Sequence, residues 1–186
     1  MLCCRMLSGR KHHRVAPVDM LLDAIALCQQ EVTIYLEDVD KVESAGDELH
    51  VKRTLLHQPK NSGDKYEPVT AENPVREGER ITVHIAIHSK QDLAFVYMKD
   101  PYIAAFVPAN IHERLGWGTD VNWVESPRQA SISFFFHRLP MGTTVVEYEL
   151  IATHRGTYTL GPTTIECEYA PEYRAQSSGG KIKVLE

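Results

Sequence analysis

Residues 131–173 read SISFFFHRLPMGTTVVEYELIATHRGTYTLGPTTIECEYAPEY. Runs of alternating residues are separated here by turn signals at 140–142 (PMG) and 154–156 (HRG), and a further break follows at 161–162 (GP). Period-two alternation between Gly and Pro residues is typical of half-buried antiparallel strands. The stretch therefore predicts a β architecture for the C-terminal half of the chain.

The alternation continues on both sides of that stretch. Residues 81–88 (ITVHIAIH) alternate isoleucine or valine with other residues, and the pattern resumes at Leu93, Phe95 and Tyr97. Further strands are expected near 31–36, 49–51 and 181–185, whereas 58–79 and 108–129 are interpreted as long connections because Pro, Gly and polar residues interrupt them. About eight or nine strands at this spacing predict an all-β, antiparallel immunoglobulin- or fibronectin III-like sandwich.

The N-terminal residues differ from the rest. Residues 1–16 are interpreted as a disordered tail or a segment outside the domain, and 17–30 (PVDMLLDAIALCQQ) as one N-terminal helix. Pro17 suits a first helical turn, and Leu21, Ala24 and Ile25 share an apolar face that must pack against a partner. We expect 17–60 to be the remnant of a preceding domain, 61–186 to be the sandwich, and an isolated fragment to form a homodimer through the helix.

Composition and charge narrow the function classes. The 186 residues are 43% hydrophobic and 24% charged, with a net charge of −5 and no basic stripe, which argues against nucleic acid as a partner. No apolar run reaches the length of a membrane span, and the start of the chain lacks the pattern of a secretion signal. We therefore expect either an intracellular protein or a piece of a longer one.

Chemistry-bearing motifs are absent from the sequence. It contains no Gly-x-Ser-x-Gly, phosphate-loop or His-Glu-x-x-His pattern. His84 and His88 lie about 13 Å apart along one strand, too far to bind one metal ion together, and Glu147 and Glu149 are expected in solvent. We predict no catalytic residue, cofactor or metal site, and no enzyme activity.

Aromatic residues are the better candidates for an interaction site. Phe134 and Phe136 should join the core, so Phe135, between them, must be covered by another element or form a contact surface. Trp117 and Trp123 lie in the expected 108–129 loop, and tryptophan is favoured at interfaces. The alternative for both tryptophans is a lid folded back on the core.

Three segments together resemble a known family. They are REGERITVHIAIHSKQDLAFVYMKDPYIAAFVP (76–108), the ISFFF…YAPEY block (132–173) and the terminal SGGKIKV strand (178–184). Their order resembles the C-terminal macroglobulin domain of bacterial alpha-2-macroglobulin-like proteins, whereas 109–129 match poorly and 1–16 do not match.

The resemblance implies a non-catalytic C-terminal module of a broad-spectrum protease inhibitor. Such a module packs against other domains of the same large protein and gates its conformational change, with proteases as indirect targets. The family's Cys-x-x-Gln thioester is missing, because Cys28 is followed by Gln-Gln-Glu. The resemblance implies that an aromatic residue shields the reactive site, which points to Tyr169 and Tyr173, with Glu172 between them.

Two further expectations accompany this assignment. The resemblance implies a periplasmic, cell-surface or extracellular location. The alternative function is an autonomous sandwich that binds a protein or glycan through the Trp117–Trp123 loop.

Overall fold

The computed structural model describes residues 38–57, 66–70, 72–118 and 121–186. The predicted tail 1–16, the helix 17–30 and the strand 31–36 lie outside the described residues. The elements in order are η1 (Val39–Lys41), β1 (Leu49–His57), β2 (Glu67–Pro68), β3 (Val75–Arg76), β4 (Arg80–Ser89), β5 (Leu93–Pro101), β6 (Phe106–Pro108), β7 (Arg114–Gly118), β8 (Val121–Pro127), β9 (Ser131–Leu139), β10 (Gly142–Ala152), β11 (Gly156–Leu160), β12 (Thr164–Cys167), β13 (Ala170–Gln176) and β14 (Gly180–Leu185).

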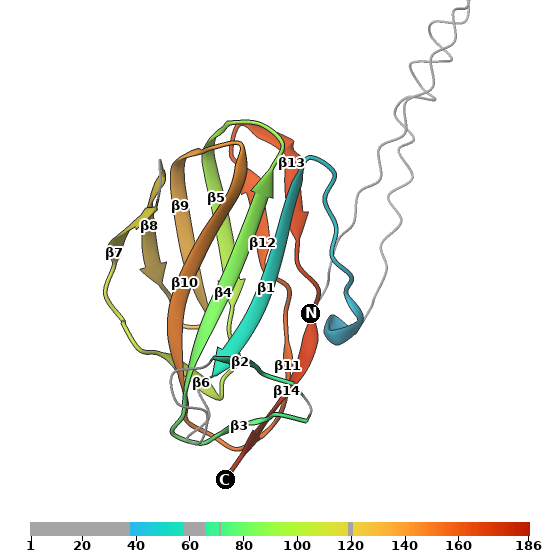
Figure 1. Ribbon diagram of the computed structural model, residues 1–186, viewed down its shortest axis with the longest axis vertical. Coiled ribbons are helices and arrows are strands. Elements are labelled where there is room, and N and C mark those ends of the chain that lie inside the picture. The colour runs from blue at the N-terminus through green and yellow to red at the C-terminus, as the bar shows by residue number, and fades with distance from the viewer. Residues whose placement is uncertain (1–37, 58–65, 71, 119–120) are drawn as a thin grey trace, which may run out of the picture. The chain divides into compact units, whose positions relative to one another are not determined.

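Two large sheets make the predicted all-β sandwich (Figure 1). One has five strands in the order β2-β1-β4-β10-β6, and the other has six in the order β13-β12-β5-β9-β8-β7. A third, three-stranded sheet of order β11-β14-β3 contains one parallel pair, β14 with β3. The other strand pairs among the described residues are antiparallel, as the alternation predicted.

The core lies between the two large sheets because each contributes one buried face. β4 alternates exposed or half-buried residues with the buried Ile81, Val83, Ile85 and Ile87. From the other sheet, β9 inserts Phe134. Phe134 and Phe136 are buried, as the sequence predicted, whereas Phe135 is 47% exposed, and its role in a contact surface stays a prediction.

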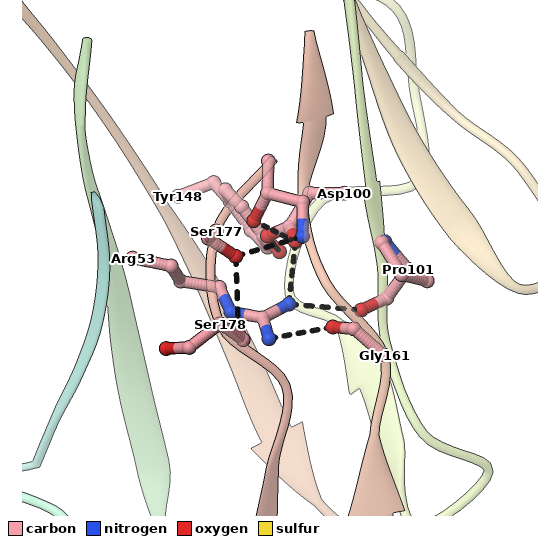
Figure 2. A network of polar contacts seen from close by, with 8 residues as sticks. Arg53, Asp100, Pro101, Tyr148, Gly161, Ser177 and Ser178 are labelled. Atoms are coloured by element: carbon pink, nitrogen blue, oxygen red, sulfur yellow. Dashed lines mark hydrogen bonds and ion pairs between the residues drawn. The ribbon is translucent and has the colours of Figure 1, made fainter. Parts of the chain in front are cut away.

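A buried polar network also joins the two sheets (Figure 2). Arg53 on β1 donates from Nη1 to Oδ1 of Asp100 on β5 over 2.7 Å, and from Nη2 to the carbonyl of Gly161 over 2.6 Å. Asp100 also accepts hydrogen bonds from the hydroxyls of Tyr148 and Thr163. Burial raises the pKa of Tyr148 well above its ordinary value, and the neighbouring Asp100 adds to the effect, so the phenol stays a hydrogen-bond donor.

The expected loop at 108–129 is wrong, because most of it forms a hairpin. β7 pairs with β8 from Arg114↔Glu125 to Gly118↔Val121, and β8 pairs in turn with β9. Gly116 and Gly118 suggest a break in the sequence, but each lies beside a side chain of β8. A Cβ at Gly116 would lie 2.1 Å from the Trp123 ring, so the glycine leaves room for that ring.

Three further strand features differ from the sequence expectations. β13 forms in the segment that contains Pro171, which is tolerated because β13 pairs with β12 at the end of its sheet. In β5, Leu93 is buried but Phe95 is exposed, because Phe95 has φ 55° and this shifts the alternation by one residue. The segment 58–79, expected as a connection, contains the short strands β2 and β3.

β1 pairs with β4 along its whole length, from Leu49↔Ser89 to His57↔Ile81. The predicted boundary at residue 60, between a remnant of a preceding domain and the sandwich, stays a prediction.

No helix in the described ranges is long and apolar enough to cross a membrane.

Candidate interaction surface

The outer face of the six-stranded sheet carries a row of apolar side chains. The strand register places Leu115 opposite Val124, Val124 opposite Phe135, and Phe135 opposite Tyr97. Cross-strand partners project from the same face, and the neighbouring Trp123, Phe136 and Val96 fill the buried one. We call Leu115, Val124, Phe135 and Tyr97 the outer row.

Further aromatic side chains adjoin the outer row. Trp117 stands two residues along β7 from Leu115 and is 71% exposed. At the other end, the Phe95 ring meets the edge of His137 at a centroid distance of 4.9 Å and of Tyr169 at 5.4 Å. The rings of Tyr97 and Phe135 lie 4.9 Å apart. The face thus presents adjoining apolar groups rather than isolated ones.

The backbone at Phe95 helps to form this cluster. Its φ of 55° lies in the left-handed region, which bulky residues rarely occupy and which costs about 1–3 kcal/mol. The Phe95 carbonyl accepts a hydrogen bond from the Glu168 amide over 2.9 Å, which fixes the strand to the β12–β13 turn. Because of this conformation, the Phe95 ring joins the solvent-facing side instead of the core.

Charged residues border the outer row. The same register continues from Tyr97 to Glu166 on β12 and from Glu166 to Arg174 on β13, and both of these residues are exposed. An apolar centre with a polar border is the usual composition of a protein–protein contact. Among the described residues, no group of three or more His, Cys, Asp and Glu side chains is placed to hold a metal ion.

The predicted site residues fall into two groups. Trp117, Phe135 and Tyr169 lie on or beside the outer row, and Glu172 is exposed on β13. Trp123 and Tyr173 belong to the other group: Trp123 is 8% exposed and Tyr173 packs against the core cluster. The hairpin therefore presents one tryptophan to solvent, and the second closes the core, as the lid alternative predicted for both.

Sequence reasoning missed four contributors to this surface: Leu115, Val124, Tyr97 and Phe95. They come from three strands, and their neighbourhood depends on the pairing register. A sequence signal existed for Val124, which alternates with Trp123 and Glu125, but the interpretation of 108–129 as a loop concealed it.

We expect Gly116→Ala to weaken the β7–β8 hairpin. The new methyl group would collide with the Trp123 ring, and overpacking of this kind costs about 1–3 kcal/mol. Denaturant unfolding followed by tryptophan fluorescence measures the loss. Gly180→Ala is the matched control, because a Cβ there meets no atom within 4 Å. Equal stability of the two variants would contradict the packing of Trp123 against Gly116.

A family model matches most of the described chain. The model for the bacterial alpha-2-macroglobulin MG10 domain matches residues 49–172. This range contains the core strands β1, β4, β5, β9 and β10 and the whole outer row. The search of curated protein sequences gave no match.

Solved structures of bacterial proteins share the fold. Salmonella alpha-2-macroglobulin reacted with methylamine superposes with a TM-score of 0.64 at 19% identity, over 78% of this chain and 10% of that chain. Native Escherichia coli alpha-2-macroglobulin, from domain MG7 to the C-terminus, gives 0.61 at 15% identity, over 77% of this chain and 24% of that chain. At these identities the likeness shows the fold. The chain spans about a tenth of the length of the Salmonella protein.

Proposed function

Because the chain belongs to the family of bacterial alpha-2-macroglobulin MG10 domains, we propose that it is a non-catalytic module of an alpha-2-macroglobulin-like protease inhibitor. It docks through the outer row against a neighbouring domain of the same large polypeptide. Docking and release of this surface gate the conformational change of the whole inhibitor. Proteases are then indirect targets, and the location is the periplasm, the cell surface or the extracellular space.

The outer row is the observation that carries this proposal. Exposed apolar side chains that adjoin over several strands mark interaction sites more often than isolated ones do. Phe135 is 47% exposed and Leu115 is 59% exposed, although both lie within regular strands. Burial of one such side chain contributes about 1.5–3 kcal/mol, so several together can hold two domains in one arrangement.

Tyr169 is the aromatic residue that suits the shielding role. It is 77% exposed in the turn between β12 and β13, and its ring rests edge-on against Phe95. Tyr173 faces the core cluster instead. We therefore assign the shielding of the reactive site to Tyr169, which lies beside the outer row and is not part of it.

The test uses the natural gene and its complete product. We expect the open reading frame to extend upstream of the Met1 codon and to encode further macroglobulin-type domains. In that product, Phe135→Asp should shift the docked–undocked equilibrium toward the undocked state by at least about tenfold, because a charge replaces a ring that docking buries. Hydrogen exchange on β8 and β9 should become faster before any protease is added.

Met141→Asp is the matched control, since Met141 is 68% exposed in the β9–β10 turn, away from the outer row. A stop codon directly upstream of Met1, with a ribosome-binding site of its own, would contradict the proposal. Equal exchange rates in the Phe135→Asp and Met141→Asp products would contradict the docking role of the outer row. The predicted homodimer through the N-terminal helix stays a separate prediction, tested by light scattering of the isolated chain.

A further inference from the structure

A second feature of the fold lies on the other large sheet, at the edge of β10. β6 pairs with β10 only from Leu150↔Pro108 to Ala152↔Phe106, whereas β4 pairs with β10 from Gly142 to Ile151. No strand in the described part of the chain pairs with the other edge of residues 143–149. We call this edge the free edge of β10.

The short length of β6 has a local cause. After Pro108, one further bond, from the Ala109 amide to the Glu149 carbonyl over 3.0 Å, ends the ladder. Asn110 then turns the chain away. Its Oδ1 accepts from the His112 amide, and its Nδ2 donates to the His112 carbonyl. The chain then continues into β7, which pairs with β8 and not with β10.

The direction of the backbone groups follows from the bonds that are present. The Glu149 carbonyl faces β6, and the Glu147 carbonyl accepts a hydrogen bond from Nη2 of Arg114 over 3.4 Å. In an antiparallel strand, alternate residues turn their amide and carbonyl groups to the same edge. Val145 and Glu147 therefore present both groups to the free edge, and Arg114 occupies the place of one donor of a missing strand.

A groove of about 480 Å³ accompanies the free edge. Its walls include Glu147 and Glu149 from β10, Arg114 from β7, and the buried Glu125 and Ile132. Glu125 is 2% exposed and receives Nε of Arg114 at 2.7 Å. Since this bond uses a different nitrogen, Arg114 can release the Glu147 carbonyl and keep its contact with Glu125.

The side chains around the free edge indicate what kind of strand fits. Cross-strand neighbours share a face, so residues paired with Val145 and Glu147 would project to the outer side, next to the carboxylates of Glu147 and Glu149. One oxygen of each carboxylate is already engaged, since Glu147 Oε1 lies 2.7 Å from Nδ1 of His84 and Glu149 Oε2 accepts from Nη1 of Arg80 over 2.8 Å. The second oxygen of each, Oε2 of Glu147 and Oε1 of Glu149, favours lysine or arginine there. The alternate residues would project toward the groove, where Ile132 offers an apolar contact beside the Arg114–Glu125 pair.

We propose that the free edge of β10 binds an extended peptide segment of a partner protein by strand addition, with basic residues on its outer side and apolar residues on its inner side. Main-chain hydrogen bonds to Val145 and Glu147 give the affinity, and the carboxylates give the preference for basic residues. This site lies on the opposite large sheet from the outer row and does not depend on the proposed docking function.

The test uses the full 186-residue chain and the synthetic peptide acetyl-Val-Lys-Val-Lys-Val-amide. NMR should show shifts of the Val145 and Glu147 amides, with a dissociation constant below about 1 mM. The same peptide N-methylated at both lysines loses the two amides that face β10, so it should bind at least about tenfold more weakly. N-methylation of the third and fifth residues, which are valines, should leave binding unchanged, because the amides of these residues point away from β10.

Charge and edge variants complete the experiment. The peptide acetyl-Val-Glu-Val-Glu-Val-amide should bind more weakly than the lysine peptide, and the preference should shrink in Glu147→Gln. Val145→Pro removes an edge amide, which edge strands tolerate, and should abolish binding, whereas Val145→Thr should retain it.

Four results would overturn the proposal. They are equal binding of the lysine-methylated and unmethylated peptides, shifts that map away from β10, no binding up to several times that concentration, and a dimer in which two copies pair their own β10 edges. The comparison of the methylated peptides remains decisive if Val145→Pro fails to fold.

Discussion

Replacement of Arg53 by methionine is expected to lower the free energy of unfolding by about 3–5 kcal/mol. The side chains of Arg53 and Asp100 are 5% and 0% exposed, and Nη1 lies 2.7 Å from Oδ1. Removal of the guanidinium leaves a buried carboxylate without a cation, and it leaves the carbonyl of Gly161 without this donor. The loss should appear in urea unfolding followed by tryptophan fluorescence.

Two comparisons make this result specific. Arg155→Met removes an arginine whose pair with Glu186 is exposed, so it should cost no more than about 1 kcal/mol. The double variant Arg53→Met, Asp100→Asn should be more stable than Arg53→Met alone. It removes the unpaired charge but keeps an acceptor for the Tyr148 hydroxyl. A double variant no more stable than the single one would mean that lost packing, and not the stranded charge, sets the cost.

The network also shows where sequence reasoning ends. Arg53 and Asp100 are 47 positions apart, and each is a charged residue in an alternating strand, where solvent is the ordinary environment. Nothing in either local pattern distinguishes them from the exposed Arg80 or Asp92. Their pairing depends on the way the two sheets face each other, which the strand pattern alone does not determine.

The strands themselves were largely predictable because alternation reports burial of one face. β4, β9 and β10 lie close to the expected runs, and the all-β sandwich follows from them. The β7–β8 hairpin and β13 were missed because Gly116, Gly118 and Pro171 signal breaks in a local reading. In the structure, Gly116 accommodates the Trp123 ring and the proline lies in a strand at the end of its sheet.

The candidate surface was predictable only in part for the same reason. Phe135 could be identified from the triplet, since three consecutive residues cannot all face the core. Its neighbours Val124 and Tyr97 come from β8 and β5. They adjoin Phe135 through register, which is determined by pairing over the whole sheet and not by any one strand.

The phenylalanine triplet gives the second large prediction. Phe134→Ala should lower the free energy of unfolding by about 3–5 kcal/mol, because it opens a cavity in a packed core. Phe134 is fully buried, and its ring lies 5.8 Å from that of Tyr148 on the facing sheet. Phe136→Ala should cost a similar amount, since Phe136 is 1% exposed and packs beside Trp123.

Phe135→Ala is the matched control within the same strand. It removes an exposed ring whose close aromatic neighbour is Tyr97, so the expected loss is about 0.5–1.5 kcal/mol. Guanidinium unfolding of the three variants therefore tests the register of β9 directly. A slip of one residue would turn Phe135 inward and its neighbours outward, and it would reverse the order of the three losses. The reversed order would also show that Phe135 does not belong to the outer row, and the proposed docking surface would then lose its physical basis.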